Sequence, residues 1–130
     1  MPPGSGRPST GGRTVAATAA GARHRVSELL VRVGVSLDSV IAADALIVTT
    51  ELVTNAIRHG DGLTLFRTVL TGDALHLFVG DASPRSPSAR PHSPGLPGGH
   101  GWPLIHRLSE NITITPFRDG KIIEAVVRLS

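Results

Sequence analysis

The stretch Glu51–Gly60, ELVTNAIRHG, has the pattern of an amphipathic helix that ends at a glycine. At about 100° per residue, the apolar residues from Ile41 to Ala56 fall on one stripe, which would pack against a core. Glu51 and Asn55 lie at one edge of that stripe, separated by about 40° around the helix axis. The question is why a helix that buries one face carries an acid and an amide at the rim of that face.

Two interpretations of this pair follow from the residues alone. Charged side chains on a helix flank are ordinarily solvated, which would leave Glu51 and Asn55 without a chemical role. Alternatively, the carboxylate of Glu51 orients a nucleophile while the amide oxygen of Asn55 binds a hard cation such as Mg²⁺. Periodicity does not decide between them, so the choice depends on the motifs downstream.

The composition indicates one aliphatic domain. The chain has 130 residues, of which 40% are hydrophobic and only 3% aromatic, so Leu, Val, Ile and Ala must build the core. It contains no cysteine, which excludes disulfides and thiolate metal sites and favours a reducing compartment. We find no secretory signal, and no apolar run approaches the roughly 20 residues that span a bilayer. We therefore expect a cytoplasmic protein that does not contact a membrane.

The positive net charge of the chain raises the question of whether it binds nucleic acid. The net charge is +3 and the pI is about 11.0. The arginines are scattered, and the aromatic side chains that stack on bases are nearly absent. The histidines show no paired spacing of the kind found in zinc sites. We therefore expect neither direct binding of nucleic acid nor a structural zinc ion.

The N-terminal part of the chain predicts a disordered segment followed by helices. Residues 1–13 are rich in Pro, Gly and Ser and are expected to be disordered, with the domain covering 14–130. A first helix is predicted within 18–35, with Gly34 placed to end it. A second helix is predicted from Asp38, as its N-cap, to about His59, and the glycine that follows is its predicted C-cap.

The remainder of the chain changes to a period of two and then back to a helix. The turns TGD and RDG separate strand-like runs, and a long segment rich in Pro, Ser and Gly allows no regular element. Strands are predicted over 63–70, 74–81, 111–117 and 121–129, the loop over 82–99 and a third helix over 101–110. The predicted fold is an α+β two-layer sandwich, in which three helices cover one face of a mixed, mostly antiparallel sheet.

Two further motifs accompany the helix. Asp81 ends a strand in LFVGDAS, where a carboxylate can accept a hydrogen bond from the exocyclic amine of a purine, although acids are also common in turns. In GGHGWPLIHRLS, Gly98, Gly99 and Gly101 precede a helix, whose free N–H groups can bind phosphate. Such glycines also occur in hinges, and the motif is not a Walker A loop. Each motif is weak by itself, and their order is more specific.

In this order the motifs resemble those of the GHKL ATPase superfamily, over roughly residues 20 to 130. ELVTNAIRHG looks like its N box, while DASPRSP and GGHGWPLIHRLS look like its two glycine-containing boxes. The resemblance is greatest to the small serine-kinase anti-sigma factors and to the related stand-alone ATP-binding regulators of actinobacteria. It implies a histidine-kinase-like ATPase fold with ATP and Mg²⁺ as cofactors.

The resemblance also implies a role for each matched residue. Glu51 would be the catalytic carboxylate that activates the attacking hydroxyl, and Asn55 would bind the metal ion and the nucleotide. Asp81 would read the adenine base. The other cofactor-binding positions would be Ser83, Gly99 and Gly101.

Three positions depart from the family's pattern, while one further segment matches it. Ser83 stands where many relatives have glycine, and His100 where many have arginine. Ile122 stands where the family often has a threonine near the adenine, and losing that hydroxyl would weaken binding by roughly 1 kcal/mol. The segment from about Pro84 to Gly98 would be the lid that closes over ATP, ordered by the nucleotide.

The function implied is that of an ATP-binding anti-sigma factor with serine/threonine kinase activity. Its partners would be a sigma factor, an anti-sigma-factor antagonist protein, or both, and the resemblance leaves room for a homodimer. An alternative is a nucleotide-binding regulator that has little or no turnover and acts only through protein contacts. A detached histidine-kinase catalytic domain is disfavoured, because no helix pair with a phosphoacceptor histidine precedes the domain in this sequence.

Overall fold

The computed structural model describes residues 18–85 and 101–130. Within these ranges the chain forms three helices and four strands. The helices are α2 (Ala19–Arg32), α3 (Val40–His59) and α4 (Gly101–Leu108). The strands are β1 (Leu63–Thr71), β2 (Ala74–Asp81), β3 (Asn111–Pro116) and β4 (Lys121–Arg128).

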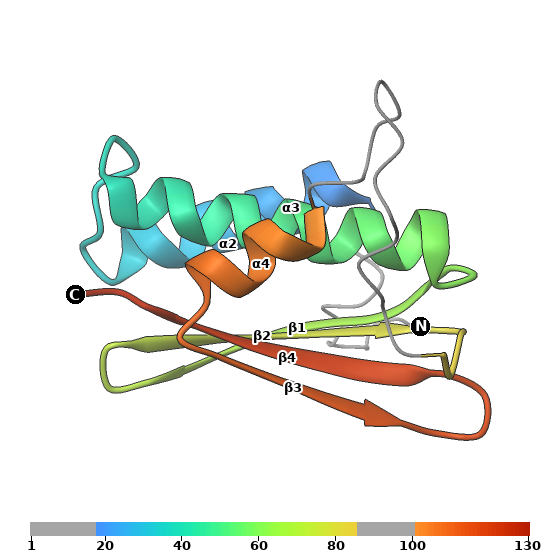
Figure 1. Cartoon of the computed structure of the whole chain (residues 1–130). Helices are drawn as coiled ribbons and strands as arrows, with labels where there is room; N and C mark the ends of the chain where they lie inside the picture. The colour runs from blue at the N-terminus through green and yellow to red at the C-terminus, as the bar shows by residue number, and fades with distance from the viewer. Residues whose placement is uncertain (1–17, 86–100) are drawn as a thin grey trace, which may run out of the picture.

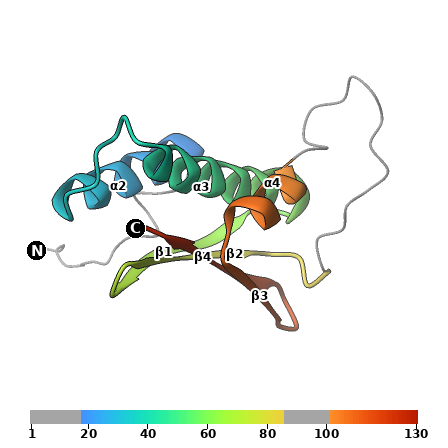
Figure 2. The same ribbon diagram turned by 60° about the vertical axis from the view of Figure 1, so that its left-hand side comes forward.

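The elements form two layers. Figures 1 and 2 show α2, α3 and α4 together on one face of the sheet, with α4 lying beside α3. The strand order is β1-β2-β4-β3, and every pair of neighbouring strands is antiparallel. The predicted α+β two-layer fold is therefore confirmed, and the sheet of the described residues contains no parallel pair.

The central strands β2 and β4 bring two distant parts of the chain together. Their register runs from Ala74 opposite Arg128 to Asp81 opposite Lys121. Alternate residues of β4 that begin with Lys121 are buried, as are the last residues of β2. The residues at the C-terminal end of β2 and the N-terminal end of β4 therefore share the face that the helices cover.

The capping residues show where α3 begins and ends. The hydroxyl of Ser39 accepts a hydrogen bond from the backbone N–H of Ala42 at 3.1 Å, so Ser39 is the N-cap of α3. The predicted N-cap, Asp38, is wrong by one residue. Its backbone N–H donates to Ser36 instead, which places it in the preceding turn. The predicted C-cap of α3, Gly60, is confirmed.

Helix α3 is the centre of the core. Its inward residues pack with aliphatic side chains of α2, α4 and the sheet, together with one fully buried aromatic residue, Phe66. By its length and composition alone, this helix is long and apolar enough to cross a membrane. The expectation that no apolar run approaches the length of a membrane span is therefore wrong here. Its place between two helices and the sheet accounts for its hydropathy, because a core helix is apolar on several sides.

Three predictions fall partly or wholly outside the described residues. These are the disordered segment 1–13, the greater part of the lid over 84–98, and the phosphate-binding Gly99.

Candidate functional site

Glu51 and Asn55 meet the beginning of α4. Both side chains are half-buried on α3, beside the fully buried Leu52. A β-carbon added to Gly101, the first residue of α4, would lie 2.5 Å from Oε1 of Glu51 and 3.4 Å from Oδ1 of Asn55. The acid, the amide and the glycine that the sequence assigned to separate motifs are therefore in mutual proximity.

The local sequence explains this arrangement. The apolar stripe of α3 directs Leu52 and Ala56 into the core, which leaves Glu51 and Asn55 at the rim where α4 packs. Ile105 buries one face of α4 and holds the helix there. Because Gly101 has no side chain, the backbone of α4 can approach the two polar groups closely, and the first N–H groups of α4 have no partner within their own helix.

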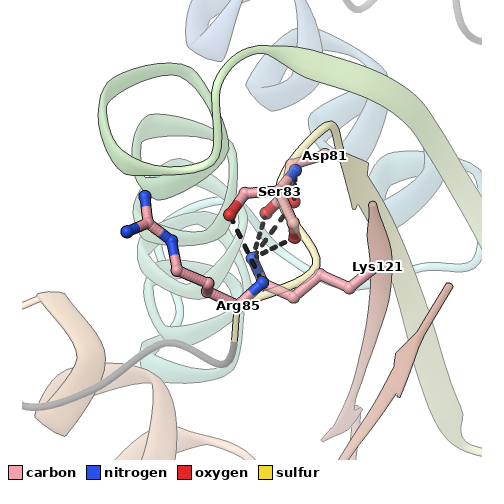
Figure 3. A network of polar contacts seen from close by, with 4 residues as sticks. All are labelled: Asp81, Ser83, Arg85 and Lys121. Carbon is pink, nitrogen blue, oxygen red and sulfur yellow. Dashed lines mark hydrogen bonds and ion pairs between the residues drawn. The ribbon is translucent and has the colours of Figure 1, made fainter. Parts of the chain in front are cut away.

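A second polar cluster lies where β2 ends and β4 begins. The Nζ atom of Lys121 lies 2.9 Å from Oδ2 and 3.1 Å from Oδ1 of Asp81. The two side chains are 4% and 5% exposed, so this is a buried ion pair. Figure 3 shows that the ammonium group of Lys121 points at the carboxylate across the two strands. A buried ion pair requires that each charge be well hydrogen-bonded.

Ser83 completes this cluster mainly through its backbone. Its N–H donates to Oδ1 of Asp81 at 2.9 Å, and its carbonyl oxygen accepts from Nζ of Lys121 at 3.0 Å. Its hydroxyl accepts a longer hydrogen bond, 3.4 Å, from the backbone N–H of Arg85 (Figure 3). The turn after β2 is therefore bound to both members of the ion pair.

Two glycines make room for Asp81. A β-carbon on Gly60 would overlap the Asp81 carboxylate, and one on Gly120 would overlap the Asp81 carbonyl oxygen. In addition, the N–H of Ala82 donates to the carbonyl oxygen of Gly60 at 2.8 Å. The C-terminal end of α3 thus contacts the Asp81 cluster directly, just as the preceding turns of α3 contact Gly101.

Helix α3 therefore connects the two clusters. Glu51 and Gly60 are nine residues apart, which corresponds to about 13 Å along a helix. Near Glu51, α3 presents a carboxylate and an amide beside the N-terminus of α4, and near Gly60 it lies beside the buried Asp81. This arrangement along α3 suits an extended ligand that has an anionic, metal-binding end and a hydrogen-bonding end.

Lys121 was not among the predicted site residues. The period of two in KIIEAVVRL places this lysine on the same face as Ile123 and Ala125, and pairing the strand with β2 would have placed it opposite Asp81. Ile122 was the residue of this strand expected to lie near the adenine. Ile122 pairs with Gly80 and lies on the other face of the sheet, so a hydroxyl at that position would not face Asp81. The predicted weakening through Ile122 therefore finds no support in this register.

A comparison with protein families identifies the domain. The family model for the histidine kinase-like ATPase domain matches residues 13–127. The chain belongs to this family. Its ATPase domain is of the GHKL type, and ATP binding follows from the family. No curated protein matches the chain in a sequence search.

The described residues of this ATPase domain fit the groups that the family implies. Oxygen atoms of Glu51 and Asn55 are the hard donors that Mg²⁺ prefers, and they lie beside the start of a helix where phosphate oxygens can be bound. Asp81 and Ser83 lie together at the other end of α3. Of the predicted site residues, only Gly99 lies outside the described ranges.

Proposed function

We propose that this ATPase domain is an anti-sigma factor that transfers phosphate from ATP to a serine or threonine of an antagonist protein. The observation that supports this most directly is the position of Gly101, whose β-carbon site lies 2.5 Å from Oε1 of Glu51 and 3.4 Å from Oδ1 of Asn55. This proximity supports the proposal, because in-line phosphoryl transfer is favoured when a base, a metal ligand and a helix N-terminus lie close together.

Each residue has a distinct role in this proposal. Glu51 accepts the proton of the partner's hydroxyl as the new O–P bond forms and the bond between the β- and γ-phosphates breaks, with ADP as the leaving group. Asn55 supplies an oxygen ligand for Mg²⁺, which offsets the negative charge of the phosphates when bound. The N–H groups at the start of α4 hold phosphate oxygens, and Asp81 accepts a hydrogen bond from the adenine amine.

The test begins with partner capture and ends with two variants. Proteins retained by the immobilised full chain, with and without ATP and Mg²⁺, are identified and then assayed for incorporation of labelled γ-phosphate. Glu51→Gln keeps the shape of the side chain but removes the base. Nucleotide binding should survive in this variant, while transfer should fall by about 10²-fold or more.

Asn55→Ala should behave differently, because it removes a ligand of the cation. Both Mg²⁺-dependent ADP affinity, measured by calorimetry, and transfer should fall. Thr54→Ala provides a matched control, since this neighbouring half-buried residue of α3 has no role in the proposal. If a captured partner accepts phosphate at the same rate from wild type and Glu51→Gln, the base is misassigned. If no partner accepts phosphate, the domain is a nucleotide-dependent binding regulator and the kinase proposal fails.

A further inference from the structure

The Asp81 carboxylate is almost fully occupied by the protein itself. An ionised carboxylate offers about four acceptor positions on its two oxygens. Oδ1 accepts hydrogen bonds from the N–H of Ser83 at 2.9 Å and from Nζ of Lys121 at 3.1 Å, while Oδ2 forms an ion pair with Nζ of Lys121 at 2.9 Å. Within the described residues, Oδ1 therefore accepts two hydrogen bonds and Oδ2 lies against the ammonium group, so the acceptor capacity left for a ligand is on Oδ2.

The ammonium group of Lys121 is directed at the same cluster. An ammonium group has three N–H donors. Nζ donates to Oδ1 of Asp81 at 3.1 Å and to the carbonyl oxygen of Ser83 at 3.0 Å, and it lies 2.9 Å from Oδ2 of Asp81. With the side chain 4% exposed, the ammonium group is surrounded by Asp81 and Ser83 and has almost no contact with water. It therefore acts on a ligand through Asp81 and not by contact.

We propose that Lys121 is a positioning residue that restricts Asp81 to a single hydrogen bond with the base, so that the site selects adenine and rejects guanine. The inference rests on the assignment of Asp81 as the base-reading residue in the proposed function. Adenine presents one exocyclic amine to such a carboxylate. Guanine presents an adjacent pair of donors, N1–H and the 2-amino group, which is best matched by both oxygens of a carboxylate at once.

The lysine works against guanine in two ways. It donates to Oδ1, which a second donor of the ligand would need, and it holds the carboxylate in one rotation through its bond to the carbonyl oxygen of Ser83. A site whose buried polar groups cannot all be paired by a ligand discriminates strongly against that ligand. Gly60 contributes to the same restriction, since the carboxylate lies directly against its backbone.

The test compares ADP with GDP by calorimetry, in the presence of Mg²⁺, for wild type and variants of the full chain. Wild type should prefer ADP. In Lys121→Met, the freed carboxylate can offer both oxygens, so the ratio of ADP to GDP affinity should narrow by about tenfold or more. Lys121→Arg keeps a cation with paired donors and should restore most of the preference.

Two controls separate specificity from folding. Arg128→Met removes the basic residue at the other end of β4, far from the site, and should leave the ratio unchanged. Lys121→Gln keeps an N–H donor for Asp81 but removes the charge, and it is measured as well in case circular dichroism shows that Lys121→Met does not fold. In this variant too, the ratio of ADP to GDP affinity should narrow.

The outcomes distinguish this inference from the site assignment beneath it. If Asp81→Asn weakens ADP binding but Lys121→Met and Lys121→Gln keep the wild-type ratio, Asp81 reads the base and the role given to Lys121 is wrong. If Asp81→Asn leaves ADP affinity intact, the base-reading assignment fails and the lysine inference fails with it. If the ratio of ADP to GDP affinity narrows in Lys121→Met and Lys121→Gln but stays near the wild-type value in Lys121→Arg, both the role of Asp81 and that of Lys121 are supported.

Discussion

An acid–base pair lies at each end of β4, and the two pairs differ in separation and in burial. At one end, Lys121 and Asp81 are 2.9 Å apart and 4% and 5% exposed. At the other, Arg128 and Asp73 are 3.7 Å apart and 54% and 48% exposed. Lys121 lies opposite Asp81 in the β2–β4 register, whereas Asp73 lies in the turn next to Ala74, the residue that pairs with Arg128. The main difference between the two pairs is their burial.

This difference shows which end of the sheet is specialised. In the exposed pair, Arg128 also contacts Glu110 at 3.4 Å, and both side chains are accessible to solvent. Each member therefore remains solvated when the other is removed. The buried pair has no such alternative, since each charge depends on its partner and on the turn at Ser83. A fold tolerates that dependence most readily where the carboxylate is needed, and in the proposed function Asp81 binds the nucleotide base.

The largest expected effect comes from removing one basic residue at each end. Lys121→Met leaves an unpaired carboxylate in the core and should lower the free energy of unfolding by about 3–5 kcal/mol. Arg128→Met should have a much smaller effect, because exposed ion pairs contribute little. Urea unfolding of both variants at neutral pH measures the two values. Equal losses at the two ends would mean that burial does not distinguish the pairs.

A second comparison uses the glycines near each end. In Gly120→Ala the new methyl group meets the carbonyl oxygen of Asp81, which is backbone and cannot rotate away, so a loss of about 2–3 kcal/mol is expected. Gly72, in the turn at the other end, has open space around it but a φ of 60°. Gly72→Ala should therefore cost about 1 kcal/mol through backbone strain alone.

Asparagine separates these two causes. This residue tolerates positive φ, so Gly72→Asn should be more stable than Gly72→Ala in thermal unfolding. Gly120→Asn should be no better than Gly120→Ala, because the obstruction there is steric. A gain on going from alanine to asparagine at position 120 would contradict the overlap with Asp81.

The sequence was sufficient for the fold but only in part for the site. Periodicity located each described helix and strand, because the core is aliphatic and the turns contain glycine. The cap of α3 was misplaced, since Ser36, Asp38 and Ser39 are all capable of capping and only the backbone direction selects Ser39. Lys121 was missed because its role depends on the register of β4 against β2, which no local pattern encodes.

A third prediction concerns the phosphate end of the site. In Gly101→Ala the new methyl group would lie 2.5 Å from Oε1 of Glu51, which is the far end of a flexible side chain. Stability should change little, because Glu51 can move and alanine favours a helix. Binding of ADP with Mg²⁺ should nevertheless weaken by roughly tenfold, or about 1.4 kcal/mol. Calorimetry combined with thermal unfolding separates the two, and unchanged affinity would place the phosphates elsewhere.

The smallest effect is expected from pH at the exposed end. A hydrogen bond from Ser130, and next the charge of Arg128, lower the pKa of Asp73 below its ordinary value. Because the pKa in the folded state is the lower one, this carboxylate stabilises the fold above its unfolded pKa of about 3.9. That contribution is lost as the pH falls through the folded value, once the carboxyl is protonated in both states. Asp73→Asn cannot titrate, so the gap in urea midpoint between wild type and this variant should be widest near neutral pH and should close below about pH 3.9.

Added salt should reduce the gap at neutral pH, since the side chains are about half exposed. A gap that stays constant on acidification would show that Asp73 stabilises this end through the shape of the turn and not through its charge.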